Sequence, residues 1–262
     1  NYWLWTMVII PKITAVSYLN TIPFVYGLKH ADSLRAELLL APPADCARNY
    51  IEGKADIALL PAAVVPQLKD TNIVTDYCIG AVGAVRTVTV MSNEPISAIK
   101  RIWLDPHSRT SVQLCGYLAQ HKWHIAPEWL AMADYKIVDT PQEGDAYLLI
   151  GDKVFGYEGR FKYVYDLAVE WRELTSLPFA FAVWVARKGV SYEVIDALQH
   201  ALTFGVEHIW EAIVELGYTG NDGGITAYEY LTRNIDFILD DEKHKALKKF
   251  WDAGLKVTPR SY

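Results

Sequence analysis

KITAVSYLNTIPF, residues 12–24, begins as an apolar strand and ends as the first turn of a helix. A group of polar side chains, from Ser17 to Thr21, lies where the strand passes into the helix. Asn and Thr are preferred at helix N-termini, and the free N–H groups there favour an anion. The stretch therefore predicts either an ordinary helix cap or an anion-binding turn, and the sequence leaves both interpretations open.

The same succession of strand and helix continues along the chain, as is typical of α/β proteins. In the first part, strands are predicted at residues 8–16, 36–42, 56–61, 72–81 and 84–92. From about residue 92 a second unit follows, with strands at 101–105, 146–152 and 178–188. In the last of these, PFAFAVWVARK, the apolar residues form a continuous run, so both faces of the strand are apolar. This indicates a strand buried on both faces.

The rest of the chain is predicted to be helical. Apolar residues at three- and four-residue spacing over residues 194–216 predict one long amphipathic helix after the Ser191 cap. Such a helical tail needs a surface to cover, and the first unit is left unfinished at residue 91. We therefore expect the tail to return to the first unit.

This order of segments predicts an α/β, two-lobed fold like that of type II periplasmic binding proteins. Residues 8–90 with 190–262 would form lobe 1 and residues 91–189 lobe 2, with crossings near Ser92 and Lys188. Ligands of open α/β sheets bind beyond the carboxyl ends of the strands, so the central cleft between the lobes is the expected site.

A second polar turn is predicted in the second lobe. In LDPHSRTSVQL, residues 104–114, a strand leads into Ser108, Arg109, Thr110 and Ser111 at the start of another helix. Two such turns facing each other across a cleft would suit a dicarboxylate. The alternative is that Ser108 is only a cap and Arg109 only solvated surface.

Composition excludes several classes of partner. The 262 residues include 25 Lys+Arg and 31 Asp+Glu, with no block of like charge. No nucleic-acid or membrane partner is therefore expected, and the oligomeric state stays open. No apolar run is long enough to cross a bilayer, and NYWLWTMVII lacks the features of a secretory signal, so we expect a cytoplasmic protein. Residues before Met7 are either an added segment or an upstream extension.

Cysteines and histidines indicate no metal site. The three cysteines, Cys46, Cys78 and Cys115, are far apart, which favours buried thiols over a disulfide or a metal site. The histidines also lack the spacing of metal ligands. We therefore expect no metal and no organic cofactor.

Four stretches resemble, in the same order, the chorismate dehydratase family of the futalosine route to menaquinone. They are AVSYLNTIPFVYGL (15–28), LDPHSRTSVQL (104–114), LLIGD (148–152) and DLAVEWRELTSLPFAFAVWVARK (166–188). The related enzyme later in that route has Ser-Pro-Cys-Pro-Asn-Asp-Thr in place of Ser-Tyr-Leu-Asn-Thr. The resemblance implies a hydro-lyase that converts chorismate to 3-[(1-carboxyvinyl)oxy]benzoate and water.

The resemblance also implies roles for particular residues. Asn20 and Thr87 are assigned to catalysis, although the family commonly has serine at the position of Thr87. Substrate binding is assigned to Ser17, Tyr18, Thr21, Ser108, Arg109, Thr110, Ser111 and Asp152. An Asp at the end of a strand is also a common helix cap, so Asp152 has a purely structural alternative.

Two questions remain open at this point. The proton could be taken by the substrate's own enolpyruvyl carboxylate, by Asp152 or by His107. A non-catalytic small-carboxylate-binding protein would have the same fold, because a fold alone does not decide function.

Overall fold

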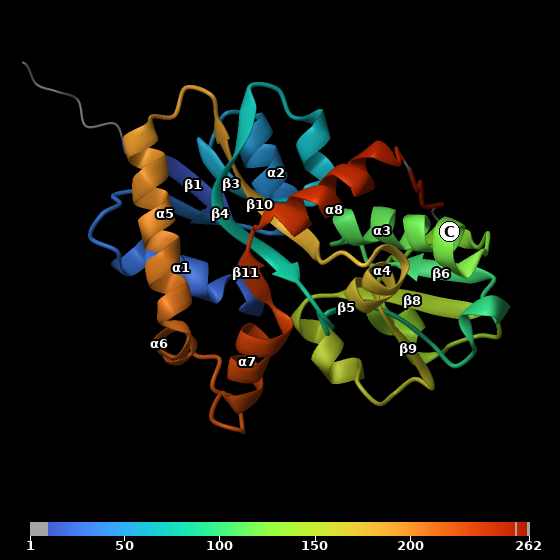
Figure 1. The fold of residues 1–262 in the computed structure, drawn as a ribbon. Coiled ribbons are helices and arrows are strands. Elements are labelled where there is room, and N and C mark those ends of the chain that lie inside the picture. Colours follow the sequence, from blue (N-terminus) through green and yellow to red (C-terminus); the bar gives the residue numbers. More distant parts are fainter. Residues whose placement is uncertain (1–9, 255, 261–262) are drawn as a thin grey trace, which may run out of the picture.

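The structure, a computed structural model, describes residues 10–254 and 256–260 (Figure 1). The predicted strand start at Val8 and the residues before Met7 lie outside this part of the chain. Two β-sheets lie side by side, each with helices packed on it (Figure 1). This is the two-lobed α/β arrangement expected from the sequence. We call each sheet with its helices a lobe.

The first sheet has the strand order β11-β4-β10-β3-β1-β2. Its strands are β1 (Lys12–Ala15), β2 (Glu37–Leu40), β3 (Ile57–Pro61), β4 (Thr71–Ala81), β10 (Phe179–Arg187) and β11 (Asp236–Ile238). β1 is parallel to both β2 and β3, so their carboxyl ends meet at one edge. The turn that follows β1 therefore lies at this edge.

The second sheet has the strand order β7-β6-β8-β5-β9. Its strands are β5 (Val88–Ser92), β6 (Arg101–Leu104), β7 (Glu128–Ala131), β8 (Asp145–Ile150) and β9 (Tyr163–Asp166). β6 is parallel to β7 and β8, so the segments that follow β6 and β8 emerge at the same edge.

The helices cover both sheets (Figure 1). They are α1 (Ile22–His30), α2 (Pro43–Ile51), α3 (Thr110–Leu118), α4 (Leu167–Thr175), α5 (Tyr192–Glu207), α6 (Ile209–Glu215), α7 (Ile225–Glu229) and α8 (Asp241–Asp252). Short 3₁₀ turns include η1 (Leu19–Thr21), η2 (Ala62–Gln67) and η6 (Asp152–Tyr157), and η7 (Tyr230–Asn234) is a π-helical turn.

The predicted lobe boundaries are wrong at both crossings. The sequence pattern assigns residues 178–188 to lobe 2, but β10 pairs with β3 and β4 in the first sheet. Its apolar residues on both faces suit the middle of either sheet, so the sequence pattern could not choose between them. β5 already belongs to the second sheet, and the first crossing is therefore residues 82–87 rather than Ser92.

The C-terminal helices return to the first lobe, as expected, but the last described residues do not. α5 packs on α1, and α8 packs on β10. Residues 256–260 then cross to the second lobe, where Arg260 bonds backbone to backbone with Trp129 and Ala131. The predicted assignment of this terminal segment to lobe 1 is therefore wrong, because the free edge of β7 offers it unpaired N–H and C=O groups.

One long helix was predicted over residues 194–216, and the structure has two. α5 ends at Glu207, and His208 adopts a non-helical conformation before α6 begins at Ile209. The His208 ring hydrogen-bonds the carbonyl of Phe204 at 2.7 Å. A helix break at a single residue leaves the spacing of apolar residues almost unchanged, so the sequence pattern does not reveal it.

Two glycines set the distance between α1 and α5. A Cβ built on Gly27 would lie 2.0 Å from the carbonyl oxygen of Ala201, and one on Gly205 would lie 1.9 Å from that of Pro23. The two backbones are therefore in direct contact. Because α1 begins immediately after the polar turn of residues 17–21, this contact fixes where the turn lies.

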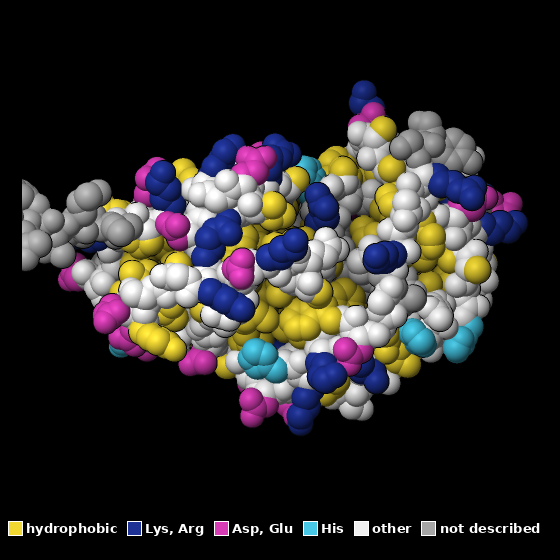
Figure 2. All heavy atoms as spheres, turned by 90° about the horizontal axis from the view of Figure 1, so that it is seen from above, with side chains coloured by type: hydrophobic (Ala, Val, Ile, Leu, Met, Phe, Trp, Pro, Cys, Tyr) yellow, Lys and Arg dark blue, Asp and Glu magenta, His cyan; other side chains and the backbone are white. Residues whose placement is uncertain are grey.

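The predictions for cysteines and charge can be compared with the structure. Cys46, Cys78 and Cys115 are buried free thiols, as expected. On the face shown in Figure 2, acidic and basic side chains are interspersed. Among the described residues, no helix combines the length and apolar character needed to cross a membrane.

Candidate functional site

The two lobes enclose a cleft at the carboxyl ends of their parallel strands. It consists of an outer hollow of about 480 Å³ and an inner cavity of about 110 Å³. The two spaces share the lining residues Val16, Tyr18, Pro43, His107 and Ile150. Small-molecule sites are about 300–1,000 Å³, a range that the outer hollow reaches by itself.

The first polar turn separates structural from available side chains. The Thr21 hydroxyl accepts from the Tyr18 N–H at 3.1 Å and donates to the Val16 carbonyl at 2.6 Å. Thr21 is buried, and its hydroxyl bonds backward within the turn, so its side chain does not cap α1 as the sequence allowed. Ser17 is exposed on the outer hollow, and Asn20, half-buried, lines the inner cavity.

Tyr18 lines both parts of the cleft. Burial, with the charges of Asp105 and Asp152 as smaller causes, raises its pKa to about 12. The phenol is therefore neutral near pH 7 and can donate a hydrogen bond to an anion. Its ring approaches Gly151 of the second lobe, where a Cβ would lie 3.8 Å away.

Asp152 forms a hydrogen bond between the lobes. Both of its carboxylate oxygens lie 3.1 Å from the Leu19 N–H, at the start of η1. The carboxylate thus caps the turn that carries Asn20, although it comes from the other sheet. The sequence allowed a capping role for Asp152 but placed the cap on its own helix. The structure shows that it caps a turn in the opposite lobe.

Asp152→Asn is expected to raise the thermal midpoint near pH 7. Burial raises the pKa of Asp152, although the Leu19 N–H and Lys153 act in the opposite direction. The folded chain therefore binds a proton at the Asp152 carboxyl more tightly than the unfolded chain does. Stability is lost as the pH rises through the folded-state pKa of this carboxyl. The advantage of the variant should shrink toward the ordinary value of 3.8, where the parent is protonated.

Thermal unfolding of the parent, Asp152→Asn and the exposed control Asp32→Asn would be followed near pH 7 and near pH 4. A midpoint for Asp152→Asn below that of the parent at both pH values would contradict the prediction. It would mean that the carboxylate bond to Leu19 outweighs the desolvation of the charge.

The second polar turn lies at the start of α3. Ser108 is buried, and its hydroxyl has no hydrogen-bond partner among the described residues. It lines the inner cavity together with Arg109, Thr110 and Ser111. A buried hydroxyl without a partner costs about 1–3 kcal/mol, which a bound ligand would recover.

Arg109 and Thr110 differ in what they can offer a ligand. Arg109 is exposed, and within the described part of the chain no acidic side chain pairs with it. The Thr110 hydroxyl accepts from the Ala63 N–H at 3.1 Å and lies 3.2 Å from the Phe181 carbonyl, to which it donates. Thr110 therefore links α3 to the first lobe, and its hydroxyl proton is already committed.

Asp105 organises the outer wall of the cleft, and the sequence analysis missed it. Its buried carboxylate accepts from the Tyr135 hydroxyl at 2.8 Å, Lys153 Nζ at 2.6 Å and the Ile150 N–H at 3.0 Å. It also accepts from the His107 N–H at 3.0 Å. An acidic residue directly after the half-buried strand β6 is a usable signal for this role.

Tyr230 connects the two residues assigned to catalysis, and the sequence analysis missed it as well. Its hydroxyl lies 2.5 Å from Thr87 Oγ1; burial raises the pKa of this phenol, and the Asn20 side chain, as a nearby donor, lowers it. Thr87 is buried and lines neither part of the cleft. No motif in the sequence distinguishes Tyr230 from the other tyrosines.

Residues 11–255 match the model of a protein family described as menaquinone biosynthesis. The chain belongs to this family. A curated relative, a chorismate dehydratase from Thermus thermophilus, is 24% identical over 266 residues, covering 94% of this chain and 96% of the relative.

Solved structures similar to this family member have the same fold. Protein AF1704 from Archaeoglobus fulgidus has a TM-score of 0.71 and 18% identity, covering 92% of this chain and 95% of that one. The Candida albicans CA3427 gene product, described as having the generic periplasmic binding protein fold, has a TM-score of 0.64 and 13% identity, with 96% and 92% covered. The expected periplasmic-binding-protein-like fold is thus confirmed.

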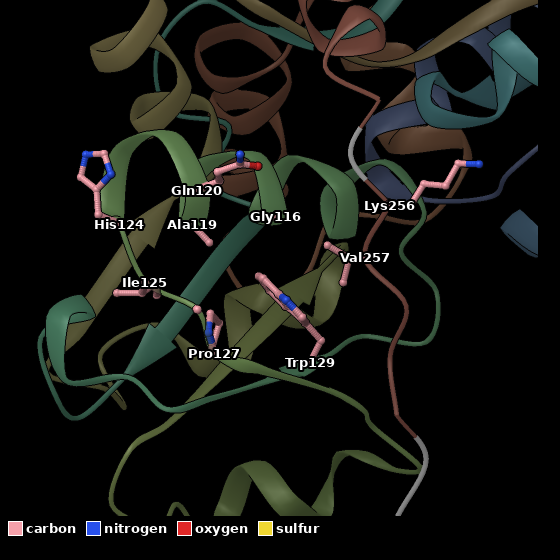
Figure 3. A pocket seen from close by; sticks show the side chains of 10 residues that line it. Gly116, Ala119, Gln120, His124, Ile125, Pro127, Trp129, Lys256 and Val257 are labelled. Atoms are coloured by element: carbon pink, nitrogen blue, oxygen red, sulfur yellow. The ribbon is translucent and has the colours of Figure 1, made fainter.

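A separate hollow of about 470 Å³ lies between α3 and β7 of this menaquinone biosynthesis family member (Figure 3). Val257 of the C-terminal segment packs there on Gly116, where a Cβ would lie 2.4 Å from Val257 Cγ2. None of the predicted site residues lines this hollow. Among the described residues, no three His, Cys, Asp or Glu side chains are grouped as metal ligands.

Proposed function

We propose that the chain dehydrates chorismate to 3-[(1-carboxyvinyl)oxy]benzoate in the futalosine route to menaquinone, as a cytoplasmic enzyme. The observation that carries the proposal is the convergence of two polar turns, at Asn20 and at residues 108–111, on one cavity. The similarity to a chorismate dehydratase over nearly the whole chain supports the same substrate.

The second turn is proposed to bind one carboxylate of chorismate. The start of α3 supplies N–H groups, and Ser108 and Arg109 supply a hydroxyl and a positive charge that no other side chain in the described part of the chain occupies. Anions are favoured at helix N-termini, and guanidinium groups bind carboxylates strongly. Ser111, which lines the same cavity, is the fourth proposed donor.

The first turn is proposed to bind the other carboxylate or the ring hydroxyl. Asn20 presents its amide to the inner cavity, and the neutral Tyr18 hydroxyl and Ser17 lie toward the outer hollow. These groups can donate hydrogen bonds without adding charge. Thr21, Thr110 and Asp152, whose polar atoms are held by the protein, would act by fixing the turns.

In the proposed reaction, the C3–H bond of chorismate breaks and its electron pair forms a ring double bond. The C4–O bond breaks, and the hydroxyl leaves as water with the proton that C3 has given up. The C3 proton is allylic and vinylogous to the ring carboxylate, so donors that neutralise this carboxylate increase its acidity. We propose that the enolpyruvyl carboxylate, held close to C3, takes the proton, so that orientation does most of the work.

Purified protein is expected to consume chorismate and release the arene product in equal amount, followed by loss of diene absorbance and by chromatography. Asp152→Asn and His107→Gln should keep most of the parent kcat, because the substrate carboxylate is the proposed base. Loss of a side-chain base typically removes about 10²–10⁴ in rate. A loss of that size in either variant, with binding intact, would assign the base to that residue.

Tight binding of chorismate without turnover would contradict the dehydratase proposal. It would favour the alternative of a small-carboxylate-binding protein, which has the same fold. Isothermal titration with chorismate and with the purified arene product, beside the turnover assay, separates the two functions.

A further inference from the structure

Tyr230 is the point at which three distant segments of the chain meet. It begins the π-helical turn η7, directly after α7. Asn20 approaches its hydroxyl from η1, and Thr87 bonds to it from the crossing between the sheets. The side chain is wholly buried, and the Phe155 ring of the second lobe packs on it edge to face at 5.2 Å.

The crossing segment holds Thr87 in place by a specific arrangement. Arg86 has a left-handed backbone conformation, with φ of 70°, which is uncommon for a residue with a side chain. The Asp166 carboxylate accepts from the Val85 N–H at 3.2 Å and from the Arg86 N–H at 2.7 Å. Strained backbone of this kind persists only where the surroundings fix it, and it is common at functional sites.

The Arg86 side chain adds to this arrangement from the other side. Its guanidinium pairs with Glu158 through bonds of 2.7 and 3.0 Å and lies over the Phe155 ring. Phe155, in turn, contacts Tyr230. Tyr230 is therefore held in two places: its hydroxyl bonds to Thr87, and its ring packs on Phe155.

Of these three side chains, Asn20 lines the cavity, whereas Thr87 and Tyr230 are buried and line neither part of the cleft. An Asn amide presents two donors on one side and an acceptor on the other. A bond from one side to a fixed phenol determines which group faces the cavity. An amide without such a bond could rotate and present either its NH2 group or its oxygen to the cavity.

We propose that Tyr230 is a positioning residue, whose hydroxyl joins Thr87 to Asn20 and so fixes the orientation of the Asn20 amide toward the substrate. The proposal deepens the proposed function and rests on it for its kinetic part. It also explains why Thr87 can matter without lining the cleft, because Thr87 acts through Tyr230.

Tyr230→Phe is the test, because it removes one oxygen and keeps the ring. Misplacement of a catalytic group by about 1 Å can cost about 10²-fold, so kcat should fall by about 10- to 100-fold, with a much smaller change in KM. In the Asn20→Ala background the same substitution should cause no further loss, since the two residues act as one unit.

Tyr50→Phe is the matched control. The Tyr50 hydroxyl is bonded to Thr71 Oγ1 at 2.6 Å, and its side chain is as deeply buried as that of Tyr230. Each variant loses a Tyr–Thr hydrogen bond, buried at Tyr230 and part-buried at Tyr50, so both should lower the thermal midpoint. Only Tyr230→Phe should lower kcat. Equal kcat values in the two variants and the parent would overturn the proposal.

A readout that does not depend on turnover separates this inference from the proposed function. In protein labelled with ¹⁵N-asparagine, the side-chain amide signals of Asn20 are identified by their loss in Asn20→Ala. They should move in Tyr230→Phe and in Thr87→Val and stay in place in Tyr50→Phe. Unmoved signals in Tyr230→Phe would overturn the positioning role even in an active enzyme, and moved signals would support it even if chorismate were not turned over.

Discussion

Asn20→Ala is expected to lower kcat for chorismate by about 10²–10³, the usual cost of removing one fixed donor from a developing charge. Asn20 is the side-chain amide of the first turn that lines the inner cavity, and it lies beside the buried phenol of Tyr230. Its loss leaves one end of the substrate without an oriented partner. KM should rise less than kcat falls, because the donor matters most once charge moves during the reaction.

Two companion variants sharpen this expectation. Asn20→Asp keeps the shape but places a negative charge beside a dicarboxylate, so it should be at least as damaging as alanine. Asn72→Ala removes an exposed asparagine at the start of β4 and should leave kcat unchanged. Steady-state kinetics with thermal midpoints would be compared across the three. Parent-like kcat in folded Asn20→Ala would exclude Asn20 from catalysis.

Gly205→Ala is expected to destabilise the fold by about 3 kcal/mol or more, at the upper end of the cost of overpacking. The added Cβ would lie 1.9 Å from the Pro23 carbonyl oxygen and 2.8 Å from the Pro23 carbonyl carbon. Both are backbone atoms, so no side chain can rotate away. α1 and α5 would have to separate, which also displaces the turn that carries Asn20.

In a chain of this size such a loss corresponds to a thermal midpoint about 6–12 °C lower. Gly27→Ala, on the facing helix, should behave alike, because its Cβ would lie 2.0 Å from the Ala201 carbonyl oxygen. Gly189→Ala is the control, since a Cβ there meets no atom within 4 Å. Parent-like midpoints for Gly205→Ala and Gly27→Ala would show that the two helices are less closely packed.

Much of the first sheet was predictable because its strands are long apolar runs between turn residues. β1, β2 and β3 lie within the ranges expected for them, and β4 begins one residue earlier than expected. The short strands β7, β9 and β11 were not expected. Each has three or four residues, among them Glu128, Asp166 and Asp236, so a periodic pattern has no length in which to show.

The site was predictable only in part. Helix N-termini that follow strands are visible in sequence, and both polar turns do line one cavity. Which hydroxyls remain available there was not visible. Thr21 and Thr110 are held by backbone groups, whereas Ser108, with the same chemistry, has no partner among the residues that the structure describes. The difference depends on Val16, Phe181 and other groups brought close by the fold.

The sequence by itself determined that the chain is α/β, that its strand pattern restarts near residue 92, and that polar turns follow the first strand of each unit. These features depend on neighbours a few residues apart. Only the tertiary structure decided that β10 completes the first sheet, that Asp152 caps Leu19 across the cleft, and that Tyr230 lies between Asn20 and Thr87. Each of these contacts joins residues more than 100 positions apart. Side-chain pairing at such separations is set by packing of whole elements, which local periodicity and propensity do not record.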